Sequence, residues 1–145
     1  MYGPHLILEG YEAPKKRLGN VGHIYGMLDK FPEVIGMTKI MPPHVQKYLG
    51  AGDPVWGVSG FVIIAESHIA VHTYPEKNFF VLDVFSCKDF DELKAVDFVV
   101  KQLSPLRYEH KLLSRGEDYP KDIVESRSIV CGDRNRFQRA AGRPG

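Results

Sequence analysis

The stretch between residues 58 and 87 constrains the fold of this chain most, because it has the composition of a buried sheet and yet carries reactive side chains. Three runs in it are rich in β-branched residues and Phe, as strands are: 58–64, 69–73 and 79–85. One serine, two histidines and two carboxylates fall between positions 66 and 76. Burying a polar group without a hydrogen bond costs free energy, so we expect these side chains to form a site.

Alternation along the second run assigns its side chains to two faces of the predicted sheet. Successive side chains of a strand point to opposite sides, so His68, Ala70 and His72 share one face while Ile69 and Val71 share the other. A lone histidine in a strand is more often a core residue bonded to a backbone carbonyl. Two histidines beside a serine and two carboxylates favour a site instead.

Two blocks of this stretch resemble the self-cleavage and active-site motif of the prokaryotic S-adenosylmethionine decarboxylases: Glu66-Ser67-His68 and His72-Thr73-Tyr74-Pro75-Glu76. Three further residues stand at the spacing of that family: Ser59, Asp83 and Cys87. The similarity is densest over 57–88 and extends more loosely from His5 to about Pro120. A Glu-Ser-His triplet alone would be unspecific, whereas the extended pattern is specific for this family.

The resemblance implies that the protein makes its own cofactor. In this family an internal serine becomes a pyruvoyl group, and the matching serine here is Ser67. Its hydroxyl would attack the carbonyl of Glu66, and elimination from the resulting ester would leave the fragments 1–66 and 67–145. Decarboxylation of an α-amino acid leaves electrons on the α-carbon, and the pyruvoyl carbonyl would accept them through a Schiff base with the substrate.

The resemblance also assigns roles to the other motif residues. Ser59 would assist processing, His72 would accept a proton during processing, and Cys87 would donate the proton in decarboxylation. Glu76 would hold the ribose hydroxyls of the substrate, although a carboxylate just after a strand can equally be a solvated surface group. Three aromatic residues are candidates to stack on adenine: Tyr48, Trp56 and Tyr74. No metal is expected at this site.

The substrate is the least constrained part of this assignment. We expect S-adenosylmethionine, with CO2 and decarboxylated S-adenosylmethionine, the aminopropyl donor of spermidine and polyamine biosynthesis, as products. Two features depart from the family pattern: Tyr74 replaces a frequent tryptophan, and the loop 42–56 has its own composition. Relatives of the family decarboxylate arginine or ornithine, and Asp53 could face the distal cation of such a substrate.

Two non-decarboxylase alternatives stay open from the sequence. The chain could be a non-cleaving paralogue that binds a nucleoside or regulates a partner. A metal site made of His68, His72 and Glu76 ranks lower, because the two-residue spacing along a strand does not favour the required geometry.

The rest of the chain supplies further strands and two helices. We expect strands near 5–9 and 34–41, helices over 15–28 and 89–103, a long loop over 41–56 and a last strand over 106–113. The first helix would end at Phe31-Pro32 and bury one face: Leu18, Val21, Tyr25 and Leu28. The second would begin at Asp89, with Glu92 closing a capping box. Its apolar stripe would be Phe90, Leu93, Val96, Val100 and Leu103.

This order of elements, β-α-β-β-β-β-α-β, predicts an α+β fold. We expect a two-layer sandwich with a mainly antiparallel sheet and both helices on one face. The other face of the sheet needs a cover, and a second copy of the chain would provide it. The expected assembly is therefore a homodimer of processed protomers with four layers, as the αββα sandwich of the family implies.

Composition bounds the remaining possibilities. A chain of 145 residues suits one domain, so we expect a decarboxylase domain over 1–124 and a basic, flexible tail over 125–145. A net charge of +1 gives no reason to expect nucleic acid as a partner. The chain shows no signal peptide and no apolar run of about 18 residues, so we expect no membrane insertion and a cytoplasmic location. Cys87 and Cys131 would then stay reduced.

Overall fold

The structure, a computed structural model, describes residues 3–51 and 55–118. The strands are β1 (Gly3–Tyr11), β2 (Thr38–Lys39), β3 (His44–Leu49), β4 (Trp56–Ala65), β5 (Ser67–Tyr74), β6 (Phe79–Ser86) and β7 (Arg107–Arg115). The helices are α1 (Lys15–Leu18), α2 (Val21–Val34) and α3 (Glu92–Leu103), with a short 3-10 helix η1 (Pro75–Lys77) between β5 and β6. None of these helices is long and apolar enough to cross a membrane.

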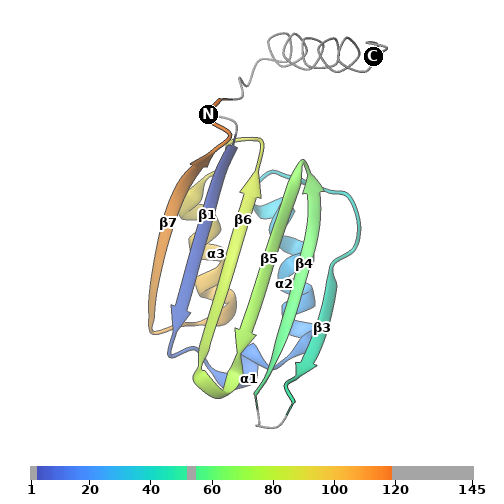
Figure 1. The fold of residues 1–145 in the computed structure, drawn as a ribbon, viewed down its shortest axis with the longest axis vertical. Helices are drawn as coiled ribbons and strands as arrows, with labels where there is room; N and C mark the ends of the chain where they lie inside the picture. Colours follow the sequence, from blue (N-terminus) through green and yellow to red (C-terminus); the bar gives the residue numbers. More distant parts are fainter. Residues whose placement is uncertain (1–2, 52–54, 119–145) are drawn as a thin grey trace, which may run out of the picture.

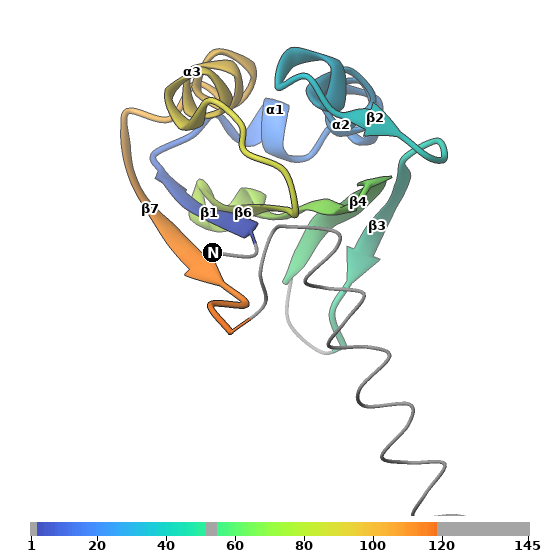
Figure 2. The ribbon, with the colours of Figure 1, turned by 90° about the horizontal axis from the view of Figure 1, so that it is seen from above.

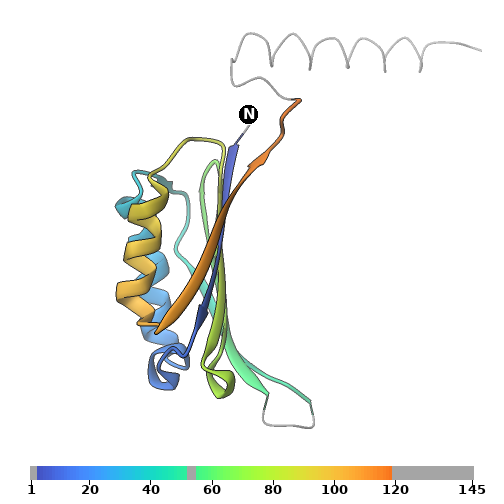
Figure 3. The same ribbon diagram turned by 90° about the vertical axis from the view of Figure 1, so that its left-hand side faces the viewer.

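The strands form one seven-stranded sheet in the order β2-β4-β5-β6-β1-β7, with β3 also paired to β4 (Figure 1). Every pairing within the described part of the chain is antiparallel. The α-helices all lie against one face of the sheet and leave the other face uncovered (Figures 2 and 3). The predicted α+β fold with a mainly antiparallel sheet and helices on one face is therefore confirmed.

The core fills the space between the sheet and the helices. On β5 the side chains of Ile69 and Val71 are fully buried there, whereas His72 is exposed on the uncovered face. Neighbouring strands follow the same alternation, with Val58 and Val62 of β4 in the core. The face assignment predicted from the period of two is confirmed.

Thr73 is one of two buried polar residues in the described part of the chain, and the other is Ser86. The Thr73 side chain is 2% exposed, and its Oγ1 accepts a hydrogen bond from the Val58 N–H at 3.0 Å. The same hydroxyl donates to the carbonyl of Leu18 at 2.8 Å. Thr73 thus ties the end of α1 to the β4–β5 hairpin without leaving an unsatisfied group.

The first predicted helix is broken into α1 and α2. Asn20 caps α2, its side chain accepting a hydrogen bond from the N–H of His23 at 3.0 Å. The new start changes the buried face, which is Ile24, Met27, Leu28 and Phe31. Val21 and Tyr25 are 37% and 41% exposed, so their predicted burial was wrong. The predicted exit at Phe31-Pro32 was also wrong, because α2 continues through a buried Pro32 to Val34.

The second predicted helix begins later than expected. The N-cap is Asp91, which accepts a hydrogen bond from the N–H of Lys94 at 3.0 Å, so the predicted cap at Asp89 was wrong. Glu92 then stands at the first helical position and bonds Nδ1 of His110 at 2.8 Å instead of closing a capping box. Leu93, predicted to be apolar core, is 71% exposed. The core positions of α3 are Ala95, Val96, Val99 and Leu103.

The segment predicted as a long loop contains a strand. β3 runs over His44–Leu49 and pairs with β4 along the edge of the sheet, and the predicted strand over 34–41 shrinks to the two residues of β2. Almost every side chain of β3 is exposed. An edge strand with two solvated faces lacks the alternation that identifies strands from sequence. Asp53 and the tail 125–145 lie outside the described residues.

Candidate active site

The predicted cleavage site lies at the tightest connection of the sheet. β4 ends at Ala65 and β5 begins at Ser67, so Glu66 alone joins the two strands, and its side chain is exposed. Ser67 has a φ of 126°, a backbone conformation that L-residues rarely adopt. Such a conformation costs about 1–3 kcal/mol and is concentrated at functional sites. The bond between Glu66 and Ser67 therefore belongs to a strained turn.

Cys87 lies at this turn as well. Ser67 is paired with Ser86 on β6, and the next residue, Cys87, donates its backbone N–H to the carbonyl oxygen of Glu66 at 3.3 Å. The carbonyl that Ser67 would attack thus already accepts a hydrogen bond from the chain. The Cys87 side chain is half-buried, and its thiol is free among the described residues. The structure brings Glu66, Ser67 and Cys87 together.

Ser59 and His72 form a second group on the uncovered face of the sheet. They are directly opposite each other on β4 and β5, and Ser59 Oγ lies 2.8 Å from Nδ1 of His72 in a hydrogen bond. A hollow of about 360 Å³ adjoins them. Its lining consists of Tyr48, Val55, Trp56, Gly57, Ser59, His72, Thr73 and Tyr74.

The two groups lie at different places along the β4–β5 hairpin. His72 is five positions beyond Ser67 on β5, and five residues of a strand span roughly 17 Å at about 3.3 Å each. Ser59 faces His72 and is equally remote from the turn. Within one chain, therefore, Ser59 and His72 do not reach Ser67.

Glu76 lies at the end of β5, on η1, and is held by two donors. Its Oε1 accepts hydrogen bonds from Nε1 of Trp56 at 2.8 Å and from Nζ of Lys15 at 2.6 Å. Lys15 and then Trp56 hold the pKa of the Glu76 carboxyl below its ordinary value of 4.5. Tyr74 stacks on Phe79, with ring centroids 5.5 Å apart. The structure thus places the predicted substrate residues Trp56, Tyr74 and Glu76 in one region beside the hollow.

His68, considered above only as a possible metal ligand, and His5, for which the sequence suggested no role, both lie at the carboxylate of Asp83. Nε2 of His68 lies 2.9 Å from Oδ2 of Asp83, and Nε2 of His5 lies 3.4 Å from the same oxygen. His5 and His68 flank Phe85 on the two neighbouring strands. His5 was missed because it is remote in sequence from the motif. Across the described part of the chain no group of three or more His, Cys, Asp or Glu side chains could hold a metal ion, so His68, His72 and Glu76 do not converge.

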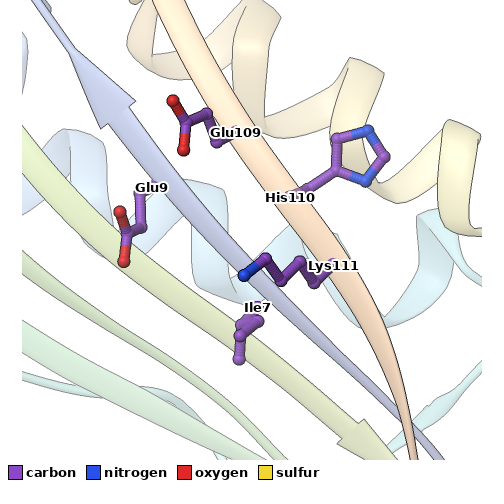
Figure 4. Close-up of a pocket in the computed structure, with 5 residues that line it drawn as sticks. All are labelled: Ile7, Glu9, Glu109, His110 and Lys111. Atoms are coloured by element: carbon purple, nitrogen blue, oxygen red, sulfur yellow. The ribbon is translucent and has the colours of Figure 1, made fainter.

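A smaller hollow of about 80 Å³ lies away from the motif, between β1 and β7 (Figure 4). Its lining is Ile7, Glu9, Glu109, His110 and Lys111. Glu9 and Glu109 face each other across the two strands, and each has a local partner. The hydroxyl of Tyr11 donates to Glu9 at 2.7 Å, which raises the pKa of Tyr11, and Arg107 pairs with Glu109 at 3.4 Å. None of these residues belongs to the predicted site.

Comparison with known proteins agrees with the motif. The family model for S-adenosylmethionine decarboxylase matches residues 4–116. An S-adenosylmethionine decarboxylase proenzyme of Aquifex aeolicus is 30% identical over 133 residues, which cover 88% of this chain and 94% of that protein. One of Thermotoga petrophila is 36% identical over 106 residues, which cover 72% of this chain and 77% of that protein. The crystal structure of the adenosylmethionine decarboxylase from Aquifex aeolicus superposes with a TM-score of 0.67 at 29% identity, covering 79% of this chain and 91% of that one. The chain belongs to the S-adenosylmethionine decarboxylase family, a family of decarboxylases.

Proposed function

We propose that this protein is a self-processing, pyruvoyl-dependent decarboxylase that converts S-adenosylmethionine to its decarboxylated form and CO2. The observation that carries the proposal is the strained turn at Ser67, where the Glu66 carbonyl accepts the N–H of Cys87. The names of the relatives support the same substrate and the same proenzyme character. The cytoplasmic location stays a prediction from the sequence.

Self-cleavage would begin at the turn. Oγ of Ser67 attacks the carbonyl carbon of Glu66, and the oxyanion that develops is the oxygen that already faces the Cys87 N–H. The peptide C–N bond between Glu66 and Ser67 then breaks, and the proton of the Ser67 hydroxyl passes to the freed amine. An ester now joins the carbonyl carbon of Glu66 to Oγ of Ser67. A base removes the α-proton of residue 67, and the fragment 1–66 leaves with the main-chain carboxylate of Glu66 at its new C-terminus. Hydrolysis of the remaining dehydroalanine releases ammonia and leaves a pyruvoyl group. Relief of the unfavourable φ at Ser67 favours the first step.

The base for elimination would come from a second copy of the chain. His72, bonded to Ser59, is the predicted base, but it lies roughly 17 Å from Ser67 in its own chain. The uncovered sheet face also exposes apolar side chains, with Phe61 and Leu113 at 39% and 45%. A two-fold axis across the strands would pack two such faces and lay the Ser59–His72 pair of one protomer over the turn of the other. The result is a homodimer of processed protomers with four layers and two composite sites.

Decarboxylation would use the same residues after processing. A pyruvoyl group at position 67 would supply an electron sink for the electrons released with CO2. The thiol of Cys87, beside residue 67, would return a proton to the α-carbon. Glu76 would accept hydrogen bonds from the ribose hydroxyls, and Trp56 and Tyr74 line the hollow where adenine would lie. This arrangement fits a pyruvoyl group made in place.

Co-expression of two inactive variants tests both the cleavage and the composite site. Ser67→Ala lacks the nucleophile and His72→Ala lacks the base, so each expressed alone should stay a single chain. In mixed dimers the His72→Ala chain receives His72 from its partner, and it should split into 1–66 and 67–145. Tags of different length identify the cleaved chain on a gel. If the His72→Ala chain stays intact beside Ser67→Ala while wild-type protein cleaves, the composite site is wrong.

Substrate identity is tested on the processed wild-type enzyme. Release of labelled CO2 is measured from S-adenosylmethionine, arginine and ornithine in parallel. We expect release from the nucleoside substrate alone. Turnover of arginine or ornithine without turnover of S-adenosylmethionine would refute the proposed substrate, and a wild-type chain that never cleaves would refute the pyruvoyl mechanism.

A further inference from the structure

The carboxylate of Glu76 is held in one orientation by residues that are far apart in the sequence. Lys15 comes from α1, Trp56 from the start of β4 and Glu76 from η1, and α1 lies beside the strand ends (Figure 1). Both donors bond the same oxygen, Oε1. Within the described residues Oε2 has no hydrogen-bond partner, so it is the oxygen left for a ligand.

The indole of Trp56 is itself fixed in place. A Cβ on Gly19 would lie 2.4 Å from Cη2 of Trp56, so only glycine lets the ring pack against the end of α1. Nζ of Lys47 lies 4.6 Å from the centroid of the same ring. The Trp56 N–H therefore reaches Glu76 from a packed ring, although the Lys15 and Glu76 side chains are 54% and 43% exposed.

The charges around Glu76 are predominantly positive. Two further hollows adjoin Trp56, one lined by Lys15, Lys16 and Gly19 and the other by Glu76 and Lys77 together with Val55 and Tyr74. Glu76 is the single carboxylate in these two linings. Lys15 partly compensates its charge, so the region offers less negative charge to a cationic ligand than an unpaired carboxylate would.

We propose that Lys15 is a specificity-determining residue of this decarboxylase. It compensates the charge of Glu76 and orients the carboxylate so that Oε2 accepts hydrogen bonds from the neutral hydroxyls of a ribose. The same compensation disfavours the guanidinium or ammonium group of arginine or ornithine. This inference rests on the proposed function and names what selects the nucleoside substrate.

The test measures binding, because binding separates Lys15 from the chemistry at Ser67. The probes are 5′-methylthioadenosine, a neutral nucleoside that lacks the amino-acid group, and arginine. The variants are Lys15→Met, Lys15→Arg as the conservative variant and Lys16→Met as the matched control, since Lys16 adjoins Lys15 on α1 but has no bond to Glu76. All are used as processed protein, and gels verify that each variant has cleaved.

In Lys15→Met the dissociation constant of the nucleoside should rise about 1.5- to 5-fold, the size expected for an exposed ion pair. Arginine should bind more tightly than to wild type, because the charge of Glu76 is released. The KM for S-adenosylmethionine should rise by the same factor with kcat unchanged, and Lys15→Arg should restore wild-type values. Equal constants for Lys15→Met and Lys16→Met would overturn the role of Lys15. Wild-type protein that binds the nucleoside but releases no CO2 from S-adenosylmethionine would instead refute the proposed function. The binding constants of the Lys15 variants could still be compared in that case.

Discussion

The two ends of the β4–β5 hairpin differ in backbone geometry. At one end the turn through Glu66 forces Ser67 to a φ of 126°, and a neighbouring strand supplies the Cys87 N–H. Near the other end Ser59 and His72 sit in an ordinary ladder and bond each other across the strands. In the proposed mechanism the first end holds the peptide bond that is cleaved, and the second holds the acid-base pair for that reaction.

This difference shows how a contiguous motif can be divided by its own fold. Residues 66–76 are neighbours in sequence, but an extended strand separates Ser67 from His72 by roughly 17 Å. A rigid hairpin in the middle of a sheet does not bend to bring its ends together. In the proposed homodimer a two-fold axis would place the Ser59–His72 pair of each chain at the turn of the other.

Removing the hydroxyl of Ser67 should have the largest effect, because this hydroxyl is the proposed nucleophile of self-cleavage. Ser67→Ala should show no cleavage, because it lacks the hydroxyl that would attack the Glu66 carbonyl. Gel electrophoresis and the mass of the chain measure this directly. Ser86→Ala is the matched control, since Ser86 is the strand partner of Ser67 but its hydroxyl accepts the N–H of Lys88. Cleavage of Ser67→Ala would exclude Ser67 as the nucleophile.

Substitution of Cys87, beside the same turn, should distinguish self-cleavage from decarboxylation. Cys87→Ala keeps the backbone N–H that faces the Glu66 carbonyl, so cleavage should proceed. Decarboxylation should fall by about 10²- to 10⁴-fold, the range for loss of a proton donor. The measurement pairs a cleavage gel with labelled CO2 release. Undiminished CO2 release would remove the thiol from the mechanism, and loss of cleavage would show that the side chain also serves processing.

The buried hydroxyl of Thr73 should stabilise the fold around the β4–β5 hairpin. Thr73→Val leaves the carbonyl of Leu18 and the N–H of Val58 without their buried partner, which should lower the free energy of unfolding by about 1–3 kcal/mol. Urea unfolding at fixed protein concentration measures the loss. Thr38→Val, at an exposed position on β2, is the control. An unchanged midpoint for Thr73→Val would mean that the buried hydroxyl carries no net stability.

The smallest expected effect is on the pH dependence of binding near Glu76. Because Lys15 and Trp56 depress its pKa, this carboxylate stays ionised to lower pH than an ordinary glutamate. Binding that needs the carboxylate is present above its pKa and is lost as the pH falls through it. In Lys15→Met that loss should move to higher pH, toward the ordinary value of 4.5. Titration of 5′-methylthioadenosine binding over about pH 4–6 measures the shift, and coincident curves for both proteins would contradict it.

Local sequence patterns were sufficient to predict several features of this protein. The alternation of 69–73 assigned Ile69 and Val71 to the core and His72 to the open face, because the period of a strand is two wherever it lies. The spacing of Ser59, Ser67 and Cys87 pointed to the family. The fold class followed from the order of elements, since sheets with helices on one face form only a few architectures.

Contacts between residues that are far apart in the sequence follow from the three-dimensional fold. Lys15 and Glu76 are remote in sequence, as are His5 and Asp83, and no local pattern encodes either contact. β3 and the break before α2 were missed for a related reason: an edge strand exposes both faces, and a helix restarted by the Asn20 cap changes the face that it buries. The separation of Ser67 from His72 likewise follows from the strand between them, because proximity along a chain does not bring side chains into contact when the backbone between them is fully extended.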